Sequence, residues 1–303
     1  MKFKQIIPSD FRKLKPFFNR QRHRLSVYSL SSIIAWQTEE FHPCAFVDKD
    51  ALFIAGEYAT LKKNRHLILP ISPTREYAPE ELYDLAKGFG FEKYWFIPED
   101  YLKQYDKKRV KALFKVKEQK DFEDYVYSTD DLAKLKGNKY SRKRNLIHQF
   151  KRSYVYRDRV KIEPITPSFV TECKDFLEKW CDEQNCDHKD EFYLYCEKEA
   201  AVNMVENIEL LEAHGILLRI DGVVSALGIA SRLTEDMGIL QFEKAFAEVK
   251  GLYQYFDQEC ARGLFKGFTY INKESDMNIP GLAKAKKSYH PVMTVKSYAL
   301  TLR

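Results

Sequence analysis

Glycine and proline are scarce in this 303-residue chain, at 12 and 11 residues. Contents this low exclude a collagen-like or a low-complexity sequence. No stretch approaches 18 uninterrupted apolar residues, and charges interrupt the amino-terminal segment every few positions. Neither a transmembrane segment nor a secretion signal is therefore expected. We expect a cytoplasmic protein.

Three common catalytic signatures are also missing. The sequence has no Gly-x-Ser-x-Gly elbow, no Walker phosphate loop and no dinucleotide-binding glycine fingerprint. These absences remove the usual sequence support for a serine hydrolase, a P-loop enzyme or a Rossmann dehydrogenase.

Cysteines are few and scattered, six in all, and in a reducing cytosol they would remain thiols, so no disulfide is expected. Cys181, Cys186, His188 and Cys196 invite comparison with a zinc site, because thiolates and imidazole form tetrahedral sites. The cluster lacks paired, closely spaced ligands, and the apolar residues around it follow helical spacing. Buried thiols on helices are the favoured interpretation, and no metal site is predicted.

Apolar residues are plentiful, at 45% of the chain, and include 21 Phe, 19 Tyr and 3 Trp. This composition can bury substantial cores, and the length suits two domains of about 150 residues each. Both halves show the same order of elements, an antiparallel meander, a helix and a further strand. The first half has a helix at 10–20, strands at 44–47, 51–58 and 66–71, a helix at 80–87 and a strand at 94–97.

The second half repeats this order after the basic segment described below. A hairpin is indicated by Asp221-Gly222, because glycine tolerates the positive φ of tight turns. Residues 86–89 and 94–97 match 261–264 and 268–271 locally, which favours an internal duplication. The expected elements are strands at 209–220, 223–232 and 237–243, a helix at 251–262 and a strand at 268–271.

Between the halves lies a strongly basic segment. Residues 132–162 hold eleven Lys or Arg and one acidic residue. Such a field attracts phosphate-bearing partners such as nucleic acid, nucleotide cofactors or anionic lipid, although a solvated charged helix is an equal alternative. A helix beginning near Ser141 would carry its cations on one face and its apolar residues opposite. The cationic face comprises Arg144, His148, Lys151 and Arg152.

One strand–turn–helix junction also suggests anion binding. Glu243 ends a strand, and Gly251 opens a helix whose free amides could hold an anion. The junction resembles the GNAT N-acyltransferase fold, in which this helix start holds the pyrophosphate of acyl-CoA. Here Glu248 replaces the cation of the GNAT pattern and Tyr253 replaces a small residue, so acyl-CoA is expected only under an alternative function.

A wider resemblance covers nearly the whole chain. Residues 242–245, 251–254, 270–274 and 281–291 resemble bacterial proteins related to the C-terminal domain of phosphatidylglycerol lysyltransferase, which are tandem GNAT proteins. The most specific match is 281–291, where a lysine of the catalytic domain falls at Lys286. The basic helix also resembles that of the Fem peptidoglycan aminoacyltransferases.

This resemblance implies an α/β (α+β) fold of two tandem GNAT-like domains, each a mixed, mostly antiparallel sheet flanked by helices. We expect an N-terminal domain at 1–128, a basic helical connector at 129–160 and a C-terminal domain with the active site at 161–303. The implied reaction is aminoacyl transfer from aminoacyl-tRNA to a lipid or small soluble acceptor, without a cofactor. The amino acid, the acceptor and the oligomeric state stay open.

The resemblance also implies roles for individual residues. Lys286 would face the oxyanion or the terminal phosphate of the tRNA, and Glu243 would accept the acceptor's proton or hold the donor's amino group. The cationic face of the basic helix would contact phosphates of RNA or lipid head groups. Plainer alternatives are an exposed lysine at 286 and an ordinary ion pair at 243. Residues expected to bind substrate are Gly251, Gln254, Asn272 and Glu274.

Two rival functions remain at this point. One is an acyl-CoA-dependent N-acetyltransferase that uses the Gly251 junction. The other is a non-catalytic module that binds nucleic acid or an anionic surface.

Overall fold

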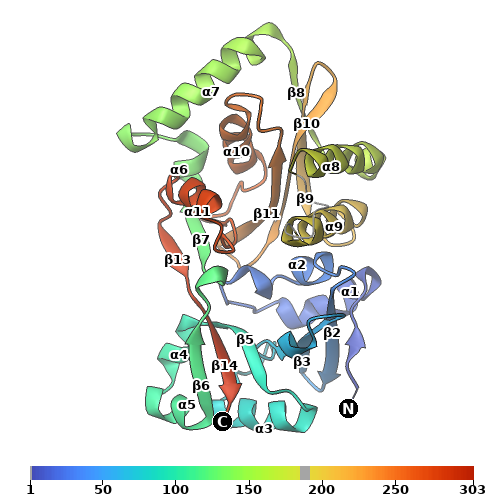
Figure 1. The fold of residues 1–303 in the computed structure, drawn as a ribbon, viewed down its shortest axis with the longest axis vertical. Helices are drawn as coiled ribbons and strands as arrows, with labels where there is room; N and C mark the ends of the chain where they lie inside the picture. The colour runs from blue at the N-terminus through green and yellow to red at the C-terminus, as the bar shows by residue number, and fades with distance from the viewer. Residues whose placement is uncertain (1, 185–191) are drawn as a thin grey trace.

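The computed structural model describes residues 2–184 and 192–303, with side chains described outside 185–195. Strands within this part of the chain form two seven-stranded sheets, stacked along the long axis of the molecule (Figure 1). In spatial order, the first sheet contains β1 (Lys4–Gln5), β2 (Phe41–Asp48), β3 (Ala51–Tyr58), β4 (His66–Leu67), β5 (Lys93–Pro98), β14 (Ser297–Leu302) and β6 (Phe114–Glu118).

The second sheet follows the same plan. Its strands, in spatial order, are β13 (Met293–Val295), β7 (Asp124–Ser128), β12 (Tyr270–Asn272), β11 (Met237–Ala245), β10 (Val223–Arg232), β9 (His214–Ile220) and β8 (Val160–Pro164). Both sheets are antiparallel except for one central parallel pair each, β4 with β5 and β11 with β12. Parallel neighbours need a crossover connection, and here it contains α3 (Pro79–Phe89) or α10 (Leu252–Gly263). The predicted fold class is confirmed.

Helices cover the faces of the two sheets. The first unit carries α1 (Phe11–Leu14), α2 (Leu30–Ala35), α3, α4 (Glu99–Gln104) and α5 (Lys107–Leu113). The second unit carries α6 (Thr129–Lys134), α7 (Ser141–Ser153), α8 (Val170–Gln184), α9 (Phe192–Glu206), α10 and α11 (Pro280–Lys287). No helix in the described part of the chain is both long and apolar enough to cross a bilayer.

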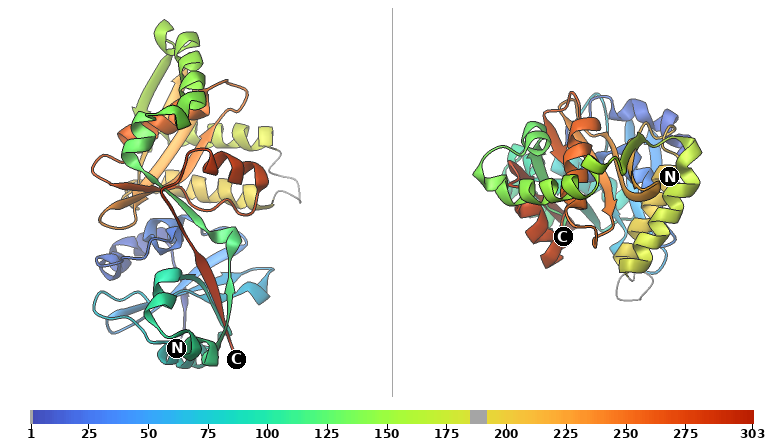
Figure 2. Two further views of the ribbon diagram at one scale, coloured as in Figure 1. Left: turned by 90° about the vertical axis from the view of Figure 1, so that its left-hand side faces the viewer. Right: turned by 90° about the horizontal axis from the view of Figure 1, so that it is seen from above.

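The two sheets exchange one strand in each direction. β7 follows the strands of the first sheet in the chain but lies in the second sheet, between β13 and β12. β14, the last strand, returns to the first sheet and lies between β5 and β6. Figures 1 and 2 show these two crossings side by side. The units expected at 1–128 and 161–303 thus each supply a strand to the other's sheet.

A continuous apolar core and buried polar contacts join the two units. Helix α2 packs against α9, and residues of both units share one buried cluster. The Ser31 hydroxyl donates to the carbonyl of Leu211 at 2.8 Å, and the Asn203 amide donates to the carbonyls of Ala35 and Gln37 at 3.2 and 2.5 Å. Buried polar groups need such partners, so these bonds fix one arrangement of the units.

Several elements differ from their predicted extents for local reasons. The helix expected at 10–20 is a short α1 flanked by 3-10 turns, and Pro16, which has no amide hydrogen, lies in the second turn. The strand expected at 66–71 is a regular strand only over β4, and Ile71 forms an isolated bridge with Leu52 of β3. The strand expected from 209 begins at His214, because turns occupy 207–212. Helix α7 begins at Ser141 as predicted.

None of the five described cysteines forms a disulfide. Cys181 and Cys196 are buried, at 1% and 9% exposure. Cys186 and His188 lie outside the described residues.

The strand exchange predicts a stability effect at the end of the chain. Leu300 of β14 is fully buried, and its replacement by alanine should lower the free energy of unfolding by about 2–3 kcal/mol. In this variant, amide hydrogen exchange should accelerate first in β5 and β6, the two neighbours of β14, and only later in β12 of the other sheet. Leu61→Ala, at a site that is 40% exposed, serves as the control. Equal effects of the two substitutions would contradict the placement of β14.

Candidate functional site

Strand β11 places neighbouring side chains on opposite faces of the second sheet. Lys244 lies on the face covered by α8 and α9, where its ammonium pairs with Glu197 at 2.7 Å and stands 4.1 Å from the ring centroid of Trp180. Glu243 points to the opposite face, toward α10 and the loop after β12. The two charged residues therefore take part in separate interactions.

Glu243 belongs to a buried cluster of three charges. The Lys273 ammonium, just after β12, donates to Glu243 Oε2 and to Asp257 Oδ1 of α10, at 2.8 Å each. The side chains are only 13% (Glu243), 13% (Lys273) and 4% (Asp257) exposed. Two carboxyl groups thus share one ammonium in a site with little access to water.

This environment sets the proton affinities of the cluster. Burial and the nearby Asp257 raise the pKa of Glu243 to about 7, although Lys273 acts in the opposite direction. Burial disfavours the Lys273 ammonium, but the two carboxylates outweigh it and raise the pKa of that lysine. Near neutral pH, Lys273 therefore keeps its charge while Glu243 is close to its titration midpoint, as suits a general base.

Lys286, on α11, lies beside this cluster and holds the loop after β12. Its ammonium donates to three backbone carbonyls, those of Lys273, Glu274 (3.1 Å) and Ser275 (2.6 Å). An ammonium has three donors, so these bonds use all of them. Burial lowers the pKa of Lys286 to about 8.

The loop that Lys286 holds also carries Glu274. The backbone of Glu274 is left-handed, with φ of +58°, and the Glu274 amide donates to Asn272 Oδ1 at 2.7 Å. Burial and the neighbouring Asp124 raise the pKa of Glu274 to about 8. The carboxyl group is therefore largely protonated at neutral pH.

Asn272 is fully buried, and its amide ties the two units together. Its Nδ2 donates to the Arg24 carbonyl at 2.8 Å and to Asp124 Oδ2 at 2.9 Å. Asp124 Oδ2 also accepts from the Ser26 amide at 2.6 Å. Asn272 thus fixes the end of β12, and its amide group is occupied by these contacts.

Gly251, expected at an anion site, instead forms a contact between helices. It is the N-cap of α10 with φ of +83°, and a Cβ there would lie 2.3 Å from the backbone oxygen of Leu146 in α7. Helix α7 therefore packs directly on the start of α10. Gln254 lies half-buried in the first turn of α10.

This close contact makes Gly251 sensitive to substitution. Gly251→Ala should lower the free energy of unfolding by about 2 kcal/mol, because the left-handed backbone and the Leu146 carbonyl both reject a methyl group. Gly263→Ala, at the end of the same helix with open space around it, should be nearly neutral. Urea unfolding of both variants measures this difference, and similar midpoints would contradict the contact.

The cationic face predicted for α7 is largely exposed. Arg144, His148 and Arg152 are open to solvent, and Lys151 is half-buried with its ammonium 5.5 Å from the Tyr255 ring centroid. Arg144 also donates to the carbonyls of Leu135 and Gly137, both at 2.6 Å. Arg144, His148 and Arg152 face outward on α7 and Lys151 lies nearer α10, whereas Glu243, Lys286 and Glu274 gather at the second sheet.

The inner face of α7 contributes a residue that the sequence analysis did not single out. Lys143 precedes Ile147 and Phe150 by four and seven residues, so it occupies the first position of the buried stripe. Its ammonium stands 3.4 Å from the Tyr289 ring centroid and donates to Ser288 Oγ at 2.8 Å. Burial lowers the pKa of Lys143 to about 8, and Asp257 and Glu243 counteract that shift.

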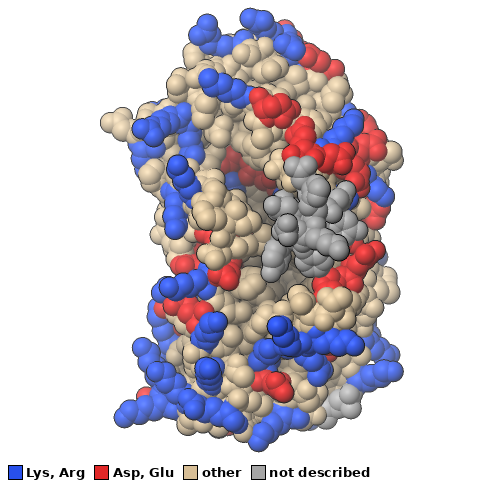
Figure 3. All heavy atoms as spheres, in the orientation of Figure 1, with Lys and Arg blue, Asp and Glu red and all other residues tan. Residues whose placement is uncertain are grey.

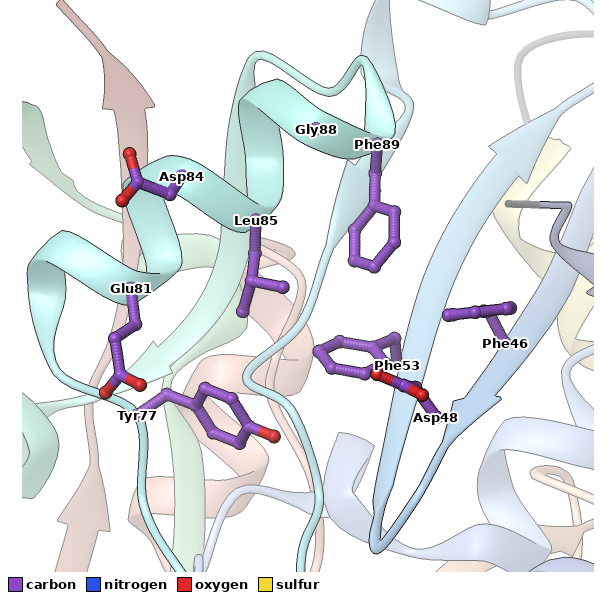
Figure 4. A pocket seen from close by; sticks show the side chains of 9 residues that line it. All are labelled: Phe46, Asp48, Phe53, Tyr77, Glu81, Asp84, Leu85, Gly88 and Phe89. Atoms are coloured by element: carbon purple, nitrogen blue, oxygen red, sulfur yellow. The ribbon is translucent and has the colours of Figure 1, made fainter.

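Figure 3 shows a hollow in the middle of the face seen in Figure 1, with acidic side chains inside it. Two further pockets belong to the first unit. One, of about 380 Å³, lies between α3 and the β2–β3 hairpin and is lined by Phe46, Phe53 and Phe89 (Figure 4). The other, of about 370 Å³, contains His23 and Asp100. Neither contains a residue of the Glu243 cluster.

Among the described residues, no group of three His, Cys, Asp or Glu side chains is arranged to hold a metal.

Comparisons with known proteins place this site in context. The family model described as phosphatidylglycerol lysyltransferase, C-terminal, matches residues 18–301. A conserved protein of unknown function from Bacteroides thetaiotaomicron is 25% identical, with a TM-score of 0.87 and full coverage of both chains. The C-terminal domain of a proposed lysylphosphatidylglycerol synthetase from Agrobacterium fabrum is 13% identical, with a TM-score of 0.65, over 96% of this chain and 91% of that one. No curated protein matches the chain.

Proposed function

We propose that this chain, which belongs to the phosphatidylglycerol lysyltransferase C-terminal family, is an acyltransferase that moves an aminoacyl group from aminoacyl-tRNA to a lipid or small soluble acceptor. The Glu243 carboxyl carries this proposal. It is buried, its pKa is about 7, and Lys273 fixes one of its oxygens. These are the properties of a general base that works near neutral pH.

The proposed reaction is a transfer between an activated ester and a nucleophile. A hydroxyl or amine of the acceptor attacks the ester carbonyl carbon, and Glu243 takes the proton that the nucleophile loses. The bond between that carbon and the ribose oxygen then breaks, and the ribose oxygen receives the proton from Glu243. Because the aminoacyl ester is already activated, alignment of donor and acceptor supplies much of the catalysis.

Lys286 is assigned a positioning role in this proposal. All three of its N–H donors go to carbonyls of 273–275, so it holds the loop that carries Lys273 and Glu274. Lys273 in turn orients Glu243. Glu274, with a raised pKa, could donate a hydrogen bond to substrate as a neutral acid, and Gln254 is the second polar group proposed to contact substrate.

The outer face of α7 is proposed to contact the phosphates of the donor RNA. Helix α7 has no acidic residue, and among the described residues no ion pair engages Arg144, Lys151 or Arg152. With His148 they form an exposed cationic face, which supports binding that weakens steeply as salt rises. The same face could make peripheral contact with anionic lipid.

The two rival functions have unequal support. An acyl-CoA-dependent reaction would need an open helix start at Gly251, but α7 packs there with its own backbone. A non-catalytic nucleic-acid module is supported by the exposed face of α7. Glu243→Gln separates that module from a transferase. If the protein is only a binding module, the natural sequence and Glu243→Gln should bind RNA equally well, and neither should transfer label.

Transfer of radiolabel from a mixed aminoacyl-tRNA pool tests the proposal. The protein is incubated with the pool and a cell extract, and label is then followed into lipid, peptide and small-solute fractions. We expect label in one fraction with the natural sequence and none above background with Glu243→Gln. Absence of label from every fraction with the natural sequence would contradict the proposed function.

A further inference from the structure

We propose that Lys143 contacts the phosphate nearest the acylated end of the donor RNA, and so joins the outer surface of α7 to the Glu243 cluster. This inference rests on the proposed function and deepens it. It concerns a residue that lies on the inner face of α7, where a helix that only packed would carry an apolar side chain.

The position of Lys143 relative to the cluster supports this role. Its ammonium lies over the Tyr289 ring at 3.4 Å, while the Lys273 ammonium is 5.3 Å from the centroid of the same ring. The ring of Tyr289 is therefore close to both Lys143 of α7 and Lys273 of the buried cluster. Lys143 is also close enough to Asp257 and Glu243 for their charges to affect its proton affinity.

Lys143 retains hydrogen-bonding capacity that Lys286 lacks. Lys286 uses all three N–H groups on backbone carbonyls, whereas Lys143 donates to one oxygen, Ser288 Oγ at 2.8 Å. No ion pair engages Lys143 among the described residues. A charged ammonium with donors to spare, beside a reactive carboxyl, is suited to hold a phosphate oxygen.

The docking of α7 fixes where Lys143 stands. Phe150 stacks on Tyr255 with ring centroids 4.9 Å apart, and the Leu146 carbonyl meets Gly251. These contacts hold the helix so that one face turns to solvent and Lys143 turns inward. A polyanion lying along the outer face would then have its last phosphate near Lys143 and its ester near Glu243.

The test uses an RNA acceptor-stem helix that ends in CCA and carries no amino acid. A second version has a neutral methylphosphonate in place of the last internucleotide phosphate. Binding of both RNAs is measured by fluorescence anisotropy for the natural sequence, Lys143→Met and Arg142→Met. Methionine keeps a long apolar stem, and Arg142 is the neighbouring exposed cation, so it controls for loss of net charge.

We expect Lys143→Met to weaken binding of the unmodified RNA by about 10- to 100-fold, and Arg142→Met by about 2-fold. The natural sequence should bind the methylphosphonate RNA about as weakly as Lys143→Met binds the unmodified RNA. Lys143→Met should bind the two RNAs equally. Independent, multiplying effects of the two changes would overturn the inference, as would equal losses in the two variants.

The outcomes also separate this inference from the proposed function. If the natural sequence transfers label but Lys143→Met behaves as Arg142→Met does, only the inference fails. If the natural sequence does not bind the RNA, both fail. Equal unfolding midpoints for the two variants show that the comparison reports on binding rather than on folding.

Discussion

Glu243→Gln should slow aminoacyl transfer by about 10²- to 10⁴-fold at pH 8. Glutamine has nearly the same shape, and its oxygen can still accept the hydrogen bond from Lys273. It cannot take a proton from the acceptor, so only the catalysis that comes from alignment remains. The measurement is the single-turnover rate with saturating aminoacyl-tRNA, which isolates the chemical step from donor binding.

Glu248→Gln is the matched control for this experiment. Glu248 follows the same strand but is exposed in the turn before α10. Its rate should stay within about 2-fold of the natural rate, because it lies outside the buried cluster. A Glu243→Gln variant that is folded and transfers at the natural rate would exclude Glu243 as the base.

Lys273→Met should lower the free energy of unfolding by about 3–5 kcal/mol at pH 8. Lys273 is the ammonium shared by Glu243 and Asp257, which are both buried. Without it, two carboxylates face each other with no bound cation between them. Urea unfolding measures the loss, and Lys266→Met, at an exposed position of the same unit, provides the control for a lost charge.

The loss should depend on pH in a defined direction. The folded-state pKa of Glu243 lies above its ordinary value of 4.5, at about 7. The stability contributed by its protonated form is full below pH 4.5 and is lost as pH rises through 7. Removal of Lys273 raises that pKa further, so the variant's deficit should be smaller at pH 5 than at pH 8. A deficit that does not change with pH would contradict the shared-ammonium arrangement.

The fold could be read from the sequence to the level of its repeated unit. Largely apolar runs and the turns between them predicted β3, β10 and β11, and helix α7 begins at Ser141 as expected. The exchange of β7 and β14 could not be read, because it depends on which sheet edge a strand meets. No strand was predicted from the sequence at 124–128 or 297–302, and local periodicity does not specify the partners of a strand.

The site was only partly visible in the sequence. Glu243 and Lys286 were identified through a resemblance, and in the structure both contact the loop at 273–275, Glu243 through the Lys273 side chain and Lys286 through backbone carbonyls. Asp257 and Lys273 were missed, because a carboxylate within a helix and a lysine after a strand look like ordinary surface residues. Lys143 could have been noticed in the sequence, because it is a charged residue within the apolar stripe of an amphipathic helix. Its role could not be inferred without knowing what that stripe packs against.

Gly251 illustrates a residue whose type was recognised and whose partner was not. The sequence identified Gly251 as the residue that opens this helix, and it is the N-cap of α10, with a positive φ. The sequence suggested that the open helix start would meet an anion, whereas it meets the backbone of α7. Contacts between elements over a hundred residues apart in the chain cannot be inferred from the junction alone.

The dependence of the transfer rate on pH tests most directly whether Glu243 is the base. Single-turnover rates between pH 5 and pH 9, with saturating aminoacyl-tRNA, should rise through a midpoint near pH 7 and then level off, because the carboxylate form accepts the proton. The residual rate of Glu243→Gln should lack this midpoint. A natural rate that is flat across the range, or a midpoint that persists in Glu243→Gln, would contradict a catalytic role for this carboxyl group.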